Sequence, residues 1–215
     1  GPFPMVPGYQ KVGVVEWMGA NVRDLKKGQT VFATITFTEG THLGFGGHLL
    51  EGPSSKNEVL PLPDSPDPVA FSGLVLTQVG WNCGWRTPGD GAPTVVVGDG
   101  MVGLWAAQTL QARGARVCLL GKHGERMKLF KPGKGDAAFR GDEENWRERV
   151  REWAGGKDLA AVVDTVGYHV NKAQNDALQQ MLQWSGHFVE AGHVGDNNRI
   201  DMRPLIMKET TLHLP

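Results

Sequence analysis

Three glycines have the spacing Gly-x-Gly-x-x-Gly, at positions 98, 100 and 103. They follow the apolar run 94–97, typical of a strand buried on both faces of a parallel sheet, and they open an expected helix over 101–113. In that context Gly98 permits a tight turn, Gly100 lets a pyrophosphate approach the backbone, and Gly103 lets the helix pack close to the strand. The phosphates would lie at the helix N-terminus, and a glycine-rich turn without a ligand is the alternative. The predicted nucleotide-binding turn consists of Gly98, Gly100, Met101, Val102 and Gly103.

The end of the next expected strand, 117–120, carries a second group of candidate residues. Sheets of this type often place an acidic residue there to hold the ribose 2′-hydroxyl of NAD. This sequence instead has Gly121, Lys122 and His123, with Arg126 three residues on. A glycine makes room for a 2′-phosphate, and Lys122 and Arg126 can pair with it, so the pattern favours NADP(H) over NAD(H). Ordinary surface cations are the alternative.

The bulk composition excludes several classes of function. The chain has 215 residues and a formal net charge of −1, which gives no electrostatic footprint for nucleic acid or an acidic membrane. No apolar run approaches the roughly 20 residues that span a bilayer, and the first residues lack the features of a signal peptide. Two isolated cysteines, Cys83 and Cys118, form neither a disulfide framework nor a zinc-ribbon spacing. We therefore expect a cytoplasmic protein that acts on a small-molecule substrate and binds neither nucleic acid nor a membrane.

The pattern of expected strands and helices changes near residue 67. Before it, β-branched segments at 9–17 and 30–36 predict strands, and the Gly-, Pro- and Ser-rich region 39–65 predicts short strands and long loops. After it, strands alternate with helices, which indicates βαβ units in a doubly wound parallel sheet. We thus predict a β-rich domain over 1–67 and a Rossmann nucleotide-binding domain over 68–215. The expected helices are 68–86, 101–113, one capped by Asp142, and 170–184, and the further strands are 159–163, 187–191 and 210–213.

Several segments, in the right order, resemble the medium-chain dehydrogenase/reductase superfamily, which includes the alcohol dehydrogenases. The resemblance implies that residues 1–67 are part of a GroES-like catalytic domain and that the chain is a fragment. It also implies that Thr77 contacts the nicotinamide ring, that Gly192 belongs to the cofactor site, and that the complete protein is a homo-oligomer, commonly a dimer. The matching segments are 3–15, 19–22, 27–31, 95–104, 164–167 and 186–192.

The metal ligands are where this chain departs from that family. Zinc-dependent members use a Gly-His-Glu sequence, and Gly8-Tyr9-Gln10 stands there instead. Neither Tyr nor Gln is a usual zinc ligand. A further family cysteine, four residues ahead of Thr77, corresponds to Gly73, and the four-cysteine structural lobe has no counterpart. We therefore predict a zinc-free member with no bound metal. The scattered metal-binding residues that remain are Cys83, His42 and His48, which more often have structural roles.

Without zinc, another group has to polarise a carbonyl or accept a proton from the substrate. A Tyr hydroxyl can do this, and Tyr9 stands where the family keeps a metal-binding His, so we predict a catalytic role for it. Gln10 could hydrogen-bond the substrate, while a packing role for Tyr9 and a catalytic role for His48 or His193 are alternatives. The predicted reaction is hydride transfer between NADP(H) and a small carbonyl or alcohol. NADPH-dependent reduction of a quinone or enone C=C bond, and a catalytically silent nucleotide-binding member, are the rival interpretations.

Overall fold

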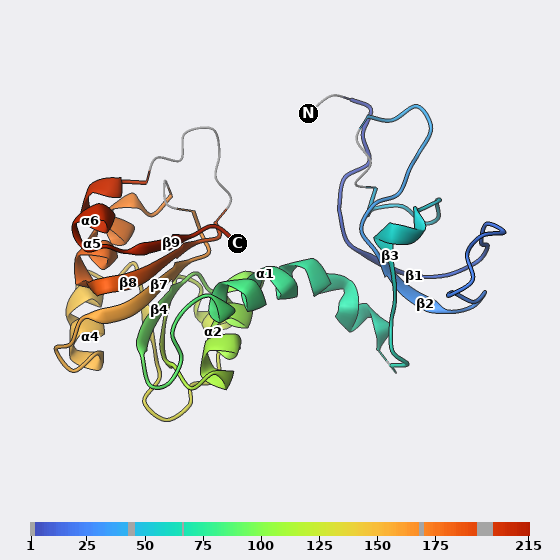
Figure 1. The fold of residues 1–215 in the computed structure, drawn as a ribbon. Coiled ribbons are helices and arrows are strands. Elements are labelled where there is room, and N and C mark those ends of the chain that lie inside the picture. Colours follow the sequence, from blue (N-terminus) through green and yellow to red (C-terminus); the bar gives the residue numbers. More distant parts are fainter. Residues whose placement is uncertain (1–2, 43–45, 66, 168–169, 193–199) are drawn as a thin grey trace. The chain divides into compact units, whose positions relative to one another are not determined.

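The apolar runs after residue 90 form one six-stranded parallel sheet, drawn from green to red in Figure 1. The strand order is β6-β5-β4-β7-β8-β9, and every neighbouring pair is parallel. From β4 the chain winds outward through β5 and β6, then returns to the other side of β4 through β7, β8 and β9. This confirms the predicted doubly wound sheet. The strands are β4 (Pro93–Val97), β5 (Arg116–Gly121), β6 (Ala137–Arg140), β7 (Leu159–Asp164), β8 (Leu182–Glu190) and β9 (Thr211–His213).

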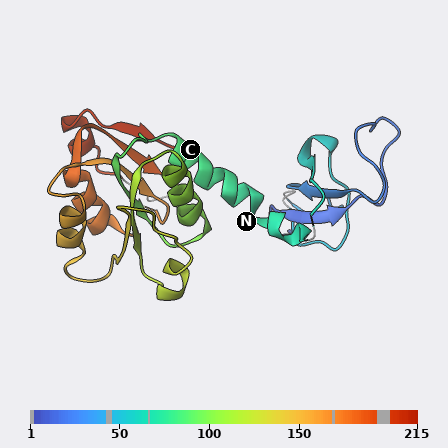
Figure 2. The ribbon, with the colours of Figure 1, turned by 90° about the horizontal axis from the view of Figure 1, so that it is seen from below.

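Alternation along β4 explains why both faces of this sheet are covered by helices (Figures 1 and 2). Val95 and Val97 belong to one buried cluster, whereas Val96 belongs to a second cluster on the opposite face. The second cluster includes Leu110 of α2, and the first includes Leu178 of α5, so each face is closed by its own helices. The helices are α1 (Leu74–Trp85), α2 (Met101–Ala112), α3 (Gly124–Met127), α4 (Trp146–Trp153), α5 (Lys172–Met181) and α6 (Met202–Met207).

This computed structural model describes residues 3–42, 46–65, 67–167, 170–192 and 200–215. It divides into an amino-terminal unit, Gly1–Val75, and a carboxy-terminal unit, Leu76–Pro215. The sequence placed this boundary somewhat earlier, at 67/68. The difference arises because the 3₁₀ helix η2 (Pro68–Gly73) packs against β1 and β2 and so stays with the amino-terminal unit.

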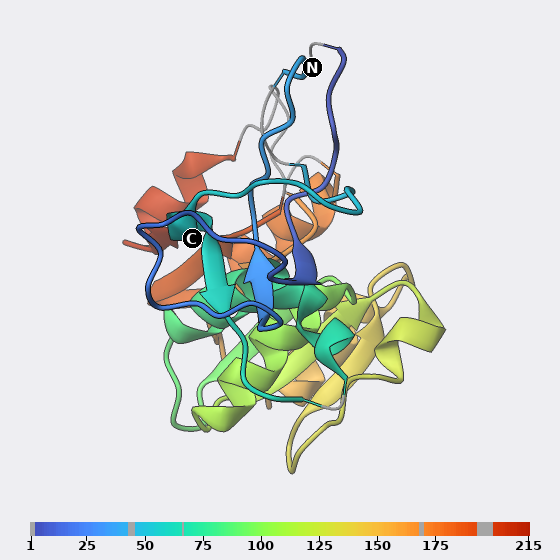
Figure 3. The ribbon, with the colours of Figure 1, turned by 90° about the vertical axis from the view of Figure 1, so that its right-hand side faces the viewer.

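The amino-terminal unit contains a small antiparallel sheet, whose strands are blue and cyan in Figure 3. Its order is β1-β2-β3, and β2 is the most buried of the three because it pairs on both edges. The expected strands at 9–17 and 30–36 are therefore present but shorter, and the described part of region 39–65 adds one short strand between loops. The elements are β1 (Lys11–Val14), β2 (Thr30–Ala33), η1 (Lys56–Glu58) and β3 (Val59–Pro61).

Three sequence predictions of local structure need correction, the first of which is the helix expected over 170–184, since its last three residues belong to β8. The helix expected over 68–86 is split into η2 and α1, since Pro68 starts a 3₁₀ segment that runs to Gly73. Asp142 does not cap α4, because both of its carboxylate oxygens accept hydrogen bonds from Arg140, at 2.9 and 2.6 Å. The helix begins four residues later and Asn145, its N-cap, makes no side-chain hydrogen bond to it. Among the described residues, no helix is both long and apolar enough to cross a membrane.

Candidate nucleotide-binding site

The turn between β4 and α2 contains three glycines whose positions suit a turn that a ligand approaches closely. Gly98 has φ +114°, and a Cβ there would lie 2.4 Å from Thr165 Oγ1. A Cβ on Gly103 would lie 2.0 Å from the carbonyl oxygen of Gly98, so α2 could not begin this close to β4 with any other residue. Gly100 differs, since a Cβ there would meet no protein atom within 4 Å. Two glycines are thus required by the fold, and the third leaves open space.

That open space belongs to a cavity of about 340 Å³ in the carboxy-terminal unit. It lies at the carboxyl ends of β4, β5 and β7, where the winding of the sheet reverses and where open α/β sheets bind their ligands. The cavity lining includes the entire predicted turn and every residue predicted at the end of β5. Its lining residues are Leu76, Val97, Gly98, Asp99, Gly100, Met101, Val102, Gly103, Leu120, Gly121, Lys122, His123, Arg126, Gly141, Thr165, Val166, Asn171 and Gln174.

Thr77 and Gly192, the other predicted cofactor residues, lie outside this lining. Thr77 is half-buried on α1, one residue after Leu76, which does line the cavity. Gly192 is buried after the end of β8, where a Cβ would come within 1.9 Å of the Gly167 backbone nitrogen. Gly192 therefore serves the close contact of two loops, and the structure does not bring it to the cavity wall.

The sequence reasoning missed Asp99, the polar residue at the centre of the site. Its residue exposure is only 5%. One carboxylate oxygen, Oδ2, accepts hydrogen bonds from the backbone N–H groups of Lys122 and His123, at 2.8 and 2.6 Å. The ring Nδ1 of His123 lies 3.1 Å from the other oxygen, Oδ1, and Arg126 Nη1 lies 4.0 Å from it. Asp99 thus ties the glycine turn to the loop after β5.

Electrostatics keep this carboxylate charged. Burial alone would raise the pKa of Asp99, but hydrogen bonds from the backbone and ring of His123 and from the backbone of Lys122 outweigh burial and lower it. The carboxylate also lies where a side chain at position 121 would be, since a Cβ on Gly121 would come 2.9 Å from Asp99 Oδ2 and 2.6 Å from Met127 Cγ. The room that the sequence assigned to a 2′-phosphate beside Gly121 is therefore filled, and any such phosphate has to lie further out, among the exposed cations.

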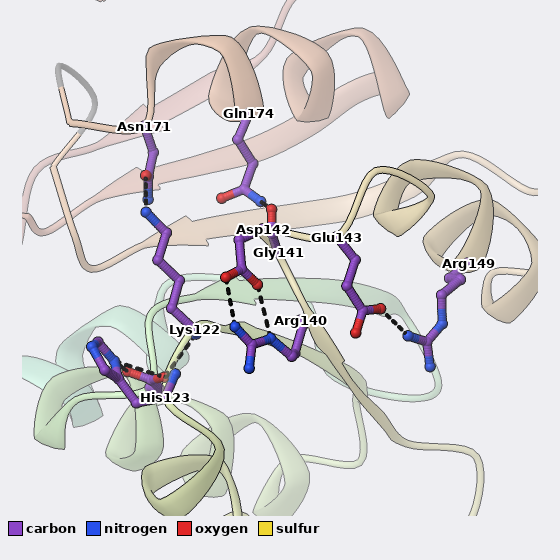
Figure 4. A network of polar contacts seen from close by, with 10 residues as sticks. Lys122, His123, Arg140, Gly141, Asp142, Glu143, Arg149, Asn171 and Gln174 are labelled. Carbon is purple, nitrogen blue, oxygen red and sulfur yellow. Dashed lines mark hydrogen bonds and ion pairs between the residues drawn. The ribbon is translucent and has the colours of Figure 1, made fainter.

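A second cavity of about 530 Å³ continues from the first along the loops after β6 and before α5. Both cavities share Lys122, Gly141, Asn171 and Gln174 as lining residues. Figure 4 shows how these residues meet: Lys122 Nζ donates to Asn171 Oδ1 at 3.4 Å, and Gln174 Nε2 donates to the Gly141 carbonyl at 3.0 Å. The two hydrogen bonds connect the carboxyl ends of β5 and β6 with the start of α5, so a ligand longer than the first cavity has a continuous surface to follow.

The wall of the cavity next to β7 is fixed by a buried acidic residue. Asp164 is fully buried, and its carboxylate accepts from the backbone of Val166 at 2.9 Å and from Asn175 Nδ2 at 2.7 Å. Burial raises the pKa of Asp164 despite these hydrogen bonds and one with the side chain of Glu190. This network holds the turn that places Thr165 and Val166 in the lining.

The two predicted catalytic residues lie in the amino-terminal unit. Tyr9 is 41% exposed. Gln10 has a structural contact, because its Oε1 accepts a hydrogen bond from the backbone N–H of Val75 at 2.9 Å and so joins the start of β1 to the start of α1. Its side-chain NH₂ group is the part that remains for a substrate. His48, an alternative candidate, packs its ring against Gly8, and His193 lies outside the described residues.

The candidate metal ligands do not converge in the part of the chain that the structure describes, where no three His, Cys, Asp or Glu side chains form a metal-binding group. Cys83 is a fully buried residue of α1, and burial raises the pKa of its thiol to about 12. A cysteine binds a metal as its thiolate, so burial that favours the neutral thiol disfavours Cys83 as a metal ligand. Gly73, at the position of the family's cysteine, ends η2 and has no side chain to offer.

A parallel doubly wound sheet with a glycine turn at its switch point is the arrangement typical of dinucleotide-binding α/β proteins. The family model of zinc-binding dehydrogenases matches residues 101–213. The chain belongs to that family, within the medium-chain dehydrogenase/reductase superfamily, as its sequence predicted.

Individual relatives are distant in sequence. The chain is 24% identical over 215 residues to a quinone oxidoreductase of Rattus norvegicus and 24% identical over 212 residues to an alcohol dehydrogenase of Geobacillus stearothermophilus. These alignments cover 98% and 88% of this chain, but only 61% of each relative. A solved mycobacterial protein in complex with NADPH has the same fold, with a TM-score of 0.76, 24% identity, and coverage of 100% of this chain and 66% of that one. The chain thus spans about three fifths of the length of the curated relatives it matches.

Proposed function

We propose that this chain is the nucleotide-binding part of an oxidoreductase that transfers a hydride between NADP(H) and a small carbonyl or alcohol, without a catalytic zinc ion. The observation that carries the proposal is the open space at Gly100, within a cavity at the switch point of the sheet. A pyrophosphate needs bare backbone at that position, and the start of α2 supplies N–H groups that favour an anion. The cofactor supplies the hydride chemistry, while the chain binds and orients it.

The cations at the end of β5 support NADP(H) as the cofactor. Lys122 and Arg126 are exposed at the cavity wall, and the charge of Asp99 is already satisfied by backbone and ring donors. A 2′-phosphate outside Asp99 would therefore face positive charge. The solved relative with NADPH is consistent with this choice.

A quinone or enone is the second candidate substrate class. Three of the curated relatives are quinone oxidoreductases, while a fourth is an alcohol dehydrogenase. We propose Tyr9 as the proton donor in either reaction and Gln10 as a support for the substrate through its NH₂ group. The complete protein is proposed to act as a homodimer in the cytoplasm.

The test begins with binding and continues with turnover. NADPH and NADH are titrated into the full chain and followed by their fluorescence, and we expect the lower Kd for NADPH. Loss of NADPH absorbance is then measured with aldehydes and ketones in one panel, and quinones and enones in another. Equal or tighter binding of NADH would contradict the cofactor assignment, and binding without turnover of any substrate would favour a silent nucleotide-binding member. Stoichiometric zinc in purified protein would contradict the metal-free mechanism.

A further inference from the structure

His123 lies between a buried carboxylate and the open side of the cavity. The exposed fraction of its side chain is 58%, whereas that of Asp99 is 6%. Its Nδ1 lies 3.1 and 3.2 Å from the two Asp99 oxygens, and its backbone N–H donates to the same carboxylate at 2.6 Å. The residue is thus held at two points, and within the described residues Nε2 is the ring nitrogen left for a ligand.

The Asp99 contact determines which ring nitrogen carries the proton. An ionised carboxylate only accepts hydrogen bonds, so the Nδ1 that faces Asp99 has to be the protonated nitrogen of the neutral ring. Nε2 is then an acceptor, and it repels a phosphate oxygen, which is also an acceptor. Only the doubly protonated imidazolium offers an N–H from Nε2 together with a positive charge. Asp99 also stabilises that cation, because its own charge is opposite.

We propose that Asp99 and His123 make 2′-phosphate recognition proton-linked: NADP(H) binds with uptake of a proton at His123, whereas NAD(H) binds without it. This inference rests on the proposed NADP(H) preference and names a residue pair responsible for it. His123 touches the phosphate, and Asp99 is a positioning residue that acts through the ring.

The other charged groups around His123 do not replace this contact. Lys122 reaches toward Asn171, and Arg126 lies 4.0 Å from Asp99 Oδ1, so neither side chain is held against Asp99 as closely as the His123 ring is. Glu125 is paired with Lys128, and Asp142 is paired with Arg140. The group of this wall whose donor toward the ligand depends on a bound proton is therefore the imidazole of His123.

The sign of the pH dependence follows from this arrangement. A 2′-phosphate has its second pKa near 6, so above about pH 6.5 the ligand is mainly a dianion and changes little further. When the imidazole loses its second proton, the phosphate loses a charged donor. Affinity for a 2′-phosphorylated ligand should fall as pH rises, by at most about tenfold per pH unit for one linked proton.

Two nicotinamide-free probes isolate the 2′-phosphate. Adenosine 2′,5′-bisphosphate and 5′-AMP are titrated into the full chain by calorimetry at pH 6.5, 7.5 and 8.5, in buffers of different ionisation enthalpy. We expect net proton uptake with the bisphosphate and none with AMP, and a Kd for the bisphosphate that rises about five- to tenfold between pH 6.5 and 8.5. The AMP affinity should stay nearly constant.

Variants separate the two residues of the pair. His123→Gln should weaken bisphosphate binding and remove both the proton uptake and the pH dependence of the bisphosphate Kd, while AMP binding stays unchanged. In Asp99→Asn, the amide NH₂ can donate to Nδ1, which shifts the ring proton to Nε2 and makes a neutral donor. That variant should keep bisphosphate binding within a few-fold and still lose the proton uptake, which loss of structure alone would not produce. His187→Gln, on β8 and outside the cavity lining, is the matched control and should behave as wild type.

The outcomes distinguish this inference from the proposed function. If His123→Gln keeps the full pH dependence, or if the wild-type chain takes up no proton, the proton-linked pair is wrong although an NADP(H) preference stands. If the wild-type chain binds AMP as tightly as the bisphosphate, the NADP(H) preference itself is wrong and the inference fails with it. Loss of uptake in both variants, with normal uptake in His187→Gln, supports the inference.

Discussion

Single alanine substitutions in the glycine turn should separate ligand binding from folding. At Gly100 the backbone has φ −82° and ψ −178°, which alanine adopts readily, and its Cβ would enter space with no protein atom within 4 Å. At Gly103 the Cβ would lie 2.0 Å from the Gly98 carbonyl oxygen, where ordinary contacts are 3.4–4 Å. The first substitution therefore obstructs only a ligand, whereas the second forces α2 away from β4.

The two substitutions should change different quantities, NADPH affinity in one case and stability in the other. For Gly100→Ala, we expect the free energy of unfolding to change by no more than about 0.5 kcal/mol and the Kd for NADPH to rise about tenfold or more, a loss of at least ~1.4 kcal/mol of binding free energy. For Gly103→Ala, relief of the overlap needs a shift of more than an ångström, and overpacking of this kind costs about 1–3 kcal/mol. With roughly 2–4 °C in Tm for each kcal/mol, the transition should move visibly.

Thermal denaturation and NADPH fluorescence titration measure the two effects on the same samples. Gly19→Ala is the matched control, since its Cβ also meets no atom within 4 Å and Gly19 belongs to the amino-terminal unit, whereas the cavity is lined by residues of the carboxy-terminal unit. Unchanged NADPH affinity in Gly100→Ala would refute the placement of the pyrophosphate at this turn. Unchanged stability in Gly103→Ala would refute the packing argument.

Three further predictions concern other parts of the chain. Tyr9→Phe should lower turnover by about 10²-fold with little change in NADPH affinity, as measured by kcat and fluorescence titration, and unchanged kcat would exclude Tyr9 as the proton donor. Because the pKa of Asp99 is lowered in the folded chain, its carboxylate stabilises the fold above the unfolded pKa near 4, and this stabilisation is lost as pH falls through the folded pKa. In an acid titration, Asp99→Asn should therefore lose less stability over that range than wild type. Because burial raises the pKa of Cys83 to about 12 and raises that of Cys118 further, neither thiol should react with a thiol reagent until the chain unfolds, and rapid labelling of native protein would contradict their burial.

The periodic parts of the fold could be predicted because their sequence signals are local. The run before Gly98 and the motif after it define β4 and the start of α2 without any tertiary information. β6 was missed because it is a four-residue strand at the edge of the sheet and its residues are only partly buried. Glycine disfavours a helix locally, yet Gly80 lies within α1 for a tertiary reason: a Cβ there would lie 2.5 Å from Trp105 Cβ, so the absence of a side chain lets α1 approach α2.

The role of Asp99 could not be predicted locally, because its partners are more than twenty residues away along the chain. The parallel register pairs Val97 with Leu120, which brings the residues just after each strand together at one edge of the sheet. Only this register shows that the second residue of the motif and the residues after β5 share one location. The same fact explains the correction at Gly121, whose vacant side-chain space is filled from the neighbouring strand.

Cofactor preference therefore depends on which groups hydrogen-bond to a carboxylate, as well as on whether a carboxylate is present. An acidic side chain at position 121 would direct its charge at the ligand, which would attract a ribose hydroxyl and repel a 2′-phosphate. Asp99 places the same charge beneath the loop, where it accepts hydrogen bonds from two backbone N–H groups and lies against the His123 ring. Its field then acts mainly on His123, whose ring it holds in one orientation, with Nδ1 toward the carboxylate. For the NADP(H) binding proposed above, a carboxylate at this edge of the sheet is acceptable because it faces the protein.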